Sequence, residues 1–147
     1  LGSEIALPEV AVVSLMTIAR AQLRLNWSKG RVSQPDLAAA LHGLQHHREV
    51  PLKLVACHHP LVEADTHATA STRGGKRALA ALARAGAGAV LSGHVHDPFD
   101  KTVEVEGHAI RIVGAGTLSQ RLRRSRPSFN RLELDRAGGF SLEVKTL

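Results

Sequence analysis

The stretch Ala87–Phe99, "AGAVLSGHVHDPF", joins an apolar run to two histidines that are one residue apart. The run "AGAVL" predicts a short buried strand, because it is apolar without interruption. Gly93 follows this strand and allows the main chain to turn sharply. His94 and His96 can then point toward one centre, and neutral imidazole nitrogen binds Zn, Fe and Mn. A His-x-His pair on its own is more often two surface histidines, so a second observation is needed.

That second observation is another histidine pair, in Leu54–Leu61, "LVACHHPL". His58 and His59 also follow an apolar run, and Pro60 keeps the chain extended as it leaves the predicted strand. The alanine-rich stretch "GGKRALAALARAGA" predicts a helix between the two strands. Strands joined in this way lie parallel, and ligands gather beyond their carboxyl ends. We therefore expect both histidine clusters at one edge of a sheet, as a metal site; separate surface histidines are the alternative.

The rest of the chain predicts an α/β domain in which parallel strands are followed by antiparallel hairpins. One further buried strand is expected at Glu9–Met16, and the strand before His58 begins at Pro51 and ends at Cys57. A helix is expected from about Gln34 to His47, capped by Ser33. The stretches "KTVEVEGHAIRIVGAG", "SFNRLEL" and "FSLEVKTL" alternate polar and apolar residues, as hairpin strands do. With 147 residues and no internal repeat or linker, residues 1–147 form a single domain.

Composition limits the classes of partner. The net charge of +6 favours phosphate-bearing partners, but aromatic residues make up only 3% of the chain, too few for base-stacking platforms. We therefore do not expect nucleic acid as the partner; the resemblance described below implies a phosphate-ester small molecule instead. Cys57 is the only cysteine, which excludes an internal disulfide and suits a reducing compartment. No apolar run is long enough to span a membrane, so we expect a cytoplasmic protein without a membrane partner.

Several other residues are weaker candidates for the site. Cys57 precedes His58, but neighbours on a strand point to opposite faces, which argues against a Cys-His nucleophile. Arg121 belongs to the basic loop "QRLRRSRPS", where a guanidinium could pair with phosphate or simply face solvent. Four polar residues near the histidine clusters are more often loop residues than ligands: Asp65, His67, Asp97 and Asp100.

Together these motifs resemble the calcineurin-like metallophosphoesterase family, and within it the bacterial branch related to cyclic-nucleotide phosphodiesterases. "LVACHHPL" is similar to the family's strand that ends in His-x-Pro, and "VLSGHVHDPF" is similar to its Gly-His-x-His motif. "NWSKGRVSQPDLAAALHGL" resembles the segment before the first of these motifs, and "GAGTLSQRLRRSRPSFNRLELD" resembles the strand, loop and strand after the second. The resemblance covers most of this chain but only the second half of the family's domain.

The resemblance implies the C-terminal half of a four-layer αββα sandwich that hydrolyses phosphate monoesters or diesters. It implies two metal ions, of Mn, Fe or Zn. By the same resemblance, His58 and His94 bind one metal and His96 binds the other. His59 is expected near the site without being assigned as a ligand, and Asp97 and Arg121 are further candidates there.

The family's upstream motifs, Asp-x-His, Gly-Asp and Gly-Asn-His, do not occur before His58 in this sequence. They supply the bridging aspartate, an asparagine ligand and the histidine that protonates the leaving group, so no catalytic residue is assigned here. The chain also begins with Leu1, and its only methionine is Met16. We expect an incomplete site whose other ligands come from an N-terminal half or a second copy. The alternative is a non-catalytic fragment, or a module that binds anions or nucleic acid through the basic loop.

Overall fold

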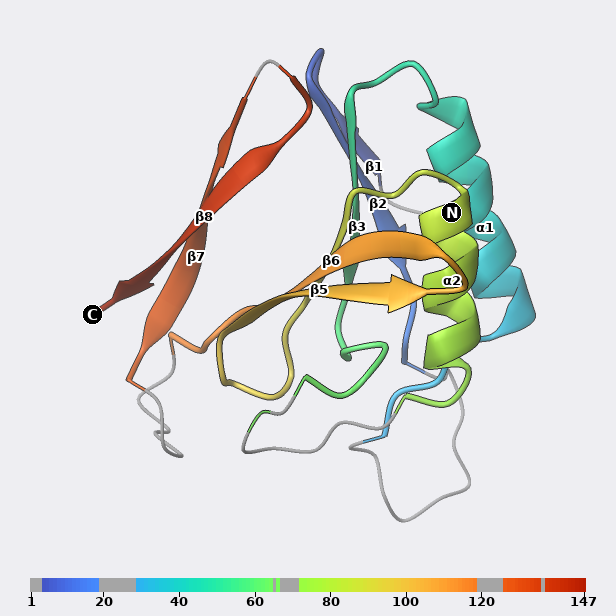
Figure 1. Ribbon diagram of the computed structural model, residues 1–147. Coiled ribbons are helices and arrows are strands. Elements are labelled where there is room, and N and C mark those ends of the chain that lie inside the picture. Colours follow the sequence, from blue (N-terminus) through green and yellow to red (C-terminus); the bar gives the residue numbers. More distant parts are fainter. Residues whose placement is uncertain (1–3, 19–28, 65, 67–71, 119–125, 136) are drawn as a thin grey trace.

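The computed structural model describes residues 4–18, 29–64, 66, 72–118, 126–135 and 137–147 of the chain. Two helices cover one face of a six-stranded sheet, and a two-stranded sheet lies on its other face (Figure 1). The helices are α1 (Gln34–His46) and α2 (Gly75–Arg84). The strands are β1 (Glu4–Ala6), β2 (Val10–Leu15), β3 (Leu52–Cys57), β4 (Ala89–Ser92), β5 (Phe99–Val105), β6 (His108–Gly114), β7 (Ser128–Leu134) and β8 (Phe140–Thr146). Within these ranges, no helix is both long enough and apolar enough to cross a membrane.

The six-stranded sheet has the order β1-β2-β3-β4-β6-β5. Its four central strands are parallel, whereas β1 and β5 pair antiparallel at the two edges. The two strands that precede the histidine pairs, β3 and β4, are direct neighbours with Leu54 opposite Ala89 and Ala56 opposite Leu91. Their carboxyl ends therefore lie side by side at the same edge of the sheet.

The predicted α/β fold class is confirmed, because parallel strands are followed by antiparallel hairpins. Ser33 caps α1 as predicted, because its side chain accepts a hydrogen bond from the main-chain nitrogen of Asp36 at 3.2 Å. Strand β1 was not predicted, since it is three residues long and fully exposed, with no burial pattern to reveal it. The position of β6 next to β4, which makes β5 the edge strand, was also not predicted from the sequence.

Each face of the sheet has its own apolar core. On the helical face, side chains of α1 and α2 pack onto the central strands, and those fully buried include Leu44, Val55, Leu79, Leu82 and Val90. On the opposite face a smaller cluster consists of Val10, Leu52, Leu54 and Ala89, against which Leu132 and Phe140 of the β7–β8 sheet pack. The β7–β8 sheet is thus a third layer held mainly by a small apolar contact.

Polar contacts reinforce this attachment. Arg111 on β6 donates two hydrogen bonds to the carboxylate of Asp100 on β5, both at 2.7 Å. The same guanidinium donates to the carbonyl oxygen of Phe140 at 2.8 Å and lies 4.2 Å from the centre of the Phe140 ring. On the neighbouring strand, the side-chain nitrogen of Asn130 donates to the carbonyl oxygen of Gly114 at 3.0 Å. One residue of β8 and one of β7 are therefore fixed to the main sheet.

We expect Arg111→Ala to lower the free energy of unfolding by about 1–2 kcal/mol, because it removes a charged hydrogen-bond donor and a cation–π contact at a partly exposed site. Denaturant unfolding followed by circular dichroism measures this loss. Arg131→Ala is the matched control, since Arg131 is exposed on β7 and pairs only with surface glutamates in the described part of the chain. Equal losses in the two variants would contradict the tethering role of Arg111.

The Asp100–Arg111 pair also predicts a pH dependence. The hydrogen bonds from Arg111 lower the pKa of the Asp100 carboxyl, and the positive charge adds to this effect. A lowered folded-state pKa means that the pair stabilises the fold above the ordinary aspartate pKa of about 4, and that this contribution is lost as the pH falls further. The stability difference between the wild type and Asp100→Asn should therefore shrink between pH 5 and roughly pH 3. If the stability difference between the wild type and Asp100→Asn does not change with pH, the ion pair adds nothing to stability. The same conclusion follows if Glu104→Gln, on the same strand, gives an equal pH dependence.

Candidate metal centre

Three histidine side chains converge at the carboxyl ends of β3 and β4. His58 and His59 directly follow β3, and His94 follows β4 after one glycine. One ring nitrogen from each of the three lies within 4.8 Å of the other two. The ring centres are 4.7 Å apart for His58 and His59, 5.0 Å for His58 and His94, and 4.3 Å for His59 and His94. The two histidine clusters therefore meet at one edge of the sheet, as the parallel topology predicted.

Hydrogen bonds hold the two histidine-bearing loops together. Nε2 of His58 lies 3.1 Å from Nδ1 of His94. The main-chain nitrogen of Gly93 donates to the carbonyl oxygen of His58 at 3.1 Å. His58 is exposed and His94 is half-buried, so the cluster can be reached from solvent.

His59 is fixed by a residue that follows a third strand, β2. Thr17 lies just after β2, and its hydroxyl oxygen is 3.1 Å from Nδ1 of His59. The same oxygen accepts a hydrogen bond from the main-chain nitrogen of His59 at 3.0 Å. Both residues are buried, and a Cβ added at Gly30 would lie 2.7 Å from the Cβ of His59. The ring of His59 is therefore held in one position from two sides.

The electrostatics of the cluster favour a neutral His59. Burial, together with the nearby His94 and His58, lowers the pKa of His59 to about 4, while the hydrogen bond with Thr17 opposes the shift. His59 is therefore neutral at physiological pH, which is the form that binds metal ions. Three imidazole nitrogens at this spacing fit a divalent ion such as Zn, Mn or Fe.

The backbone after β4 carries local strain. His94 and His96 have φ angles of 70° and 59°, in the left-handed region that non-glycine residues rarely adopt. Val95, between them, is buried and anchors the loop. Such conformations persist where the surrounding structure enforces them, and they are concentrated at functional sites.

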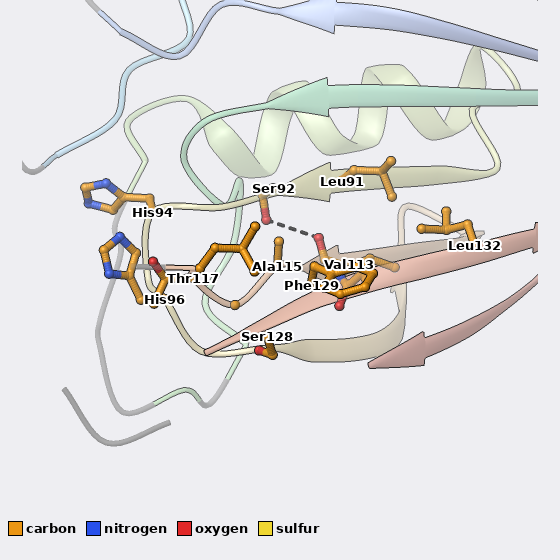
Figure 2. A pocket seen from close by; sticks show the side chains of 13 residues that line it. Leu91, Ser92, His94, His96, Val113, Ala115, Thr117, Ser128, Phe129 and Leu132 are labelled. Carbon is orange, nitrogen blue, oxygen red and sulfur yellow. Dashed lines mark hydrogen bonds between the residues drawn. The ribbon is translucent and has the colours of Figure 1, made fainter. Parts of the chain in front are cut away.

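His96 lies outside the group of three, although it follows the same strand. Both His94 and His96 line a pocket between the main sheet and β7 (Figure 2). The assignment of His96 to a second metal ion is not tested by this geometry and stays a prediction. His59, in contrast, was not assigned as a ligand and belongs to the group. Strand alternation could not reveal it, because it places the neighbours His58 and His59 on opposite faces.

The remaining candidates are not members of the three-histidine group. Asp97 is half-buried but is not one of the three grouped residues, and Asp100 is engaged with Arg111. The thiol of Cys57 donates to the carbonyl oxygen of His59 at 3.2 Å, and burial raises its pKa to about 12. Cys57 is therefore a neutral thiol with a structural contact, as predicted. Three further candidates lie outside the described residues: Asp65, His67 and Arg121.

Comparison with known proteins shows similarity at the level of the fold. No protein-family model matches this sequence, and no curated protein matches it. The structure of the sulfate thiohydrolase SoxB from Thermus thermophilus, in complex with glycerol, matches with a TM-score of 0.53 and 19% identity. That match covers 99% of this chain and 24% of SoxB. GAP50, the anchor in the inner membrane complex of Plasmodium, matches with a TM-score of 0.49 and 14% identity, over 96% of this chain and 42% of GAP50.

This chain therefore spans about a quarter of the length of SoxB and less than half of that of GAP50. At 19% identity, the likeness to SoxB shows a shared fold and nothing finer. The fold and the histidine cluster are thus two independent observations, and only the cluster bears on chemistry.

The contact between Thr17 and His59 gives a prediction for metal affinity. When Nδ1–H of His59 donates to the Thr17 hydroxyl, Nε2 keeps its lone pair for a metal ion. We expect Thr17→Val to weaken Zn²⁺ binding by roughly 10-fold to 100-fold, because the ring loses the partner that orients it. Isothermal titration calorimetry measures this change.

Thr17→Ser is the matched control, since it keeps the hydroxyl and should keep most of the affinity. If Thr17→Ser and Thr17→Val bind Zn²⁺ equally well, Thr17 does not orient a ligand. If the wild type binds no better than His58→Ala, the three imidazoles do not form a metal site.

Proposed function

We propose that this chain carries the histidine ligands of a metal-dependent phosphoesterase centre. The observation that carries the proposal is the convergence of His58, His59 and His94 within 4.8 Å at the carboxyl ends of two parallel strands. The His-x-Pro and Gly-His-x-His motifs support it, because His58 and His94 stand at positions where the resembling family has metal ligands; His59 is added by the geometry alone. The similar fold of SoxB, which is named a sulfate thiohydrolase, adds that a hydrolase is built on this arrangement of strands.

The residues of the cluster have distinct parts in this proposal. Bound metal ions would supply Lewis acidity and a water activated for attack on phosphorus. His59 gives the site a rigid base, because Thr17 and the surrounding burial fix its ring. His58, which is exposed, and His94, which is half-buried, would hold the ion where a substrate can approach from solvent. The net charge of +6 favours the arrival of an anionic phosphate ester.

The site needs oxygen ligands from elsewhere. No carboxylate among the described residues belongs to the histidine group, whereas Mn and related ions of hard character prefer oxygen. We propose that a second polypeptide supplies them, either an N-terminal half or another copy of this chain. The β7–β8 sheet is suited to receive such a partner, because in the described part of the chain it has two strands and pairs with no third.

The substrate proposed is a small phosphate monoester or diester, and the proposed location is the cytoplasm. The competing hypothesis is a non-catalytic module that binds anions or nucleic acid through the basic loop "QRLRRSRPS". Most of that loop, residues 119–125, lies outside the described residues, so the hypothesis rests on the sequence alone. Binding of nucleic acid that weakens steeply with salt and needs no metal would favour it.

The test is Mn²⁺-dependent hydrolysis of bis(p-nitrophenyl) phosphate by the 147-residue chain, over a range of protein concentrations. We expect a low rate that falls at least about tenfold in His58→Ala and in His94→Ala, since each removes one of three ligands. His108→Ala is the matched control, because His108 is exposed at the start of β6 and lies outside the cluster.

A rate that rises faster than linearly with protein concentration would support ligands supplied by a second copy. Equal rates in the wild type and in His94→Ala would contradict the proposal. Hydrolysis that needs no added metal would also contradict it. No hydrolysis at any concentration would contradict a site completed by a second copy of this chain and would leave the N-terminal half as the source of the oxygen ligands.

A further inference from the structure

Strand β8 forms one open edge of the two-stranded sheet, which Figure 1 shows as a layer apart from the main sheet. The pairing of β8 with β7 runs from Phe140 to Thr146 without a bulge, and β8 contains no proline. Bulges and prolines are common devices that keep an exposed strand from pairing with another chain. The edge of β8 lacks both, so it can accept a further strand.

Main-chain hydrogen bonds show which residues of β8 turn their polar groups toward this open edge. The main-chain nitrogen of Leu147 donates to the carbonyl oxygen of Pro127, and that of Asp135 donates to the carbonyl oxygen of Gly139. Residues that bond across an antiparallel pair alternate with residues that point away from it. The odd-numbered residues of β8 therefore bond to β7, and the even-numbered residues face the open edge.

The main-chain groups of Leu142, Val144 and Thr146 are thus available to a partner, because within the described residues no hydrogen bond uses them. The outer edge of β7 differs. There the main-chain nitrogen of Ser128 already donates to the carbonyl oxygen of Thr117 at 2.9 Å. Of the two edges of this sheet, β8 is therefore the one prepared for pairing.

The chemistry of β8 restricts how a second copy of the same strand could pair with it. Antiparallel strands form their hydrogen bonds between residues that both face the shared edge, so even-numbered residues must lie opposite even-numbered residues. A two-fold axis can then pass through Leu142, Glu143, Val144 or Lys145. An axis at Glu143 would place two carboxylates opposite each other, and an axis at Lys145 would do the same with two ammonium groups. An axis at Leu142 would use the carbonyl oxygen of Phe140, which already accepts a hydrogen bond in this chain.

The register centred on Val144 satisfies the charges and the hydrogen bonds together. Each Glu143 then lies opposite Lys145 of the second copy, and opposite charges directly across two strands stabilise the pairing. Within one chain the same two side chains already form an ion pair at 2.5 Å, so the four charges would alternate around the axis. Val144 is 41% exposed, and its counterpart would cover it.

We propose that two copies of this chain associate through β8, antiparallel and with Val144 opposite Val144, so that the two hairpins form one four-stranded sheet. The proposal narrows the partner invoked above for the β7–β8 sheet to a second copy. It does not depend on the metal centre, because no residue of the histidine cluster takes part in the pairing.

The first test is sedimentation equilibrium of the 147-residue chain in EDTA, over protein concentrations that extend to the millimolar range. We expect the mass to rise from the 15.7 kDa of one chain to twice that value. A mass that stays at 15.7 kDa at every concentration would overturn the proposal and leave the edge of β8 to a different chain. Because EDTA removes metal ions, this result is independent of whether the chain hydrolyses phosphate esters.

Charge reversal identifies the surface. We expect Glu143→Lys and Lys145→Glu each to weaken association at least about tenfold, because each places two pairs of like charges across the interface. An equimolar mixture of the two variants should associate again, since opposite charges then meet at both positions, and this recovery also shows that both variants are folded. Glu133→Lys is the matched control, because it makes the same charge change on β7 and should leave association unchanged. Charge variants that associate as tightly as the wild type, or a mixture that does not associate, would overturn the proposal.

Cysteine substitution tests the register. We expect Val144→Cys to give a covalent dimer with oxidised glutathione as the oxidant, because hydrogen-bonded residues on paired strands have Cα atoms about 5.5 Å apart, within reach of a disulfide. Leu142→Cys is the matched control, since it would face Thr146 of the second copy rather than its own counterpart. Cys57 should stay reduced in the wild type, because burial raises its pKa to about 12. Equal yields of covalent dimer from the two variants would overturn the register.

Discussion

The parallel pairing of β3 with β4 is the constraint on which the rest of the candidate site depends. Because the two strands run in the same direction, Cys57 and Ser92 end at the same edge, and the residues that follow them face each other. The helix α2 makes this pairing possible by returning the chain to the start of β4. An antiparallel arrangement would have placed His58 and His94 at opposite edges of the sheet, and no metal centre could form from them.

The attachment of β7 and β8 decides whether the pocket exists. The apolar contact between the two sheets is small, so Arg111 and Asn130 supply directional bonds that set the position of the third layer. Asn130 both lines the pocket and fixes β7, since its side-chain nitrogen donates to the carbonyl oxygen of Gly114. A substitution of Asn130 would therefore alter the attachment of β7 and the pocket wall together.

Strong local sequence patterns made the central strands and both helices predictable. The pairing of strands and the contacts between residues far apart in the sequence were not predictable in this way. The apolar runs before Cys57 and Ser92 could only be buried strands, and Ser33 had the chemistry of a helix cap. The insertion of β6 beside β4 depends on packing between segments that are distant in the sequence. The alternation of polar and apolar residues in β6 predicts a strand but does not indicate which strand it pairs with. His59 escaped assignment because the decisive contact comes from Thr17, 42 residues earlier in the chain, and no local pattern links the two.

The features that cost stability in this fold lie close to one another. His94 and His96 have left-handed backbone conformations, which cost about 1–3 kcal/mol each. The oxygens of Ser128 and Asn130 add a burial cost of about 1–3 kcal/mol each when unpaired. All four residues line the same pocket. Natural sequences break local rules chiefly where function requires it, so costs concentrated around one pocket beside the histidine cluster argue for a function there. A fragment kept only for its basic surface would give no reason for this concentration.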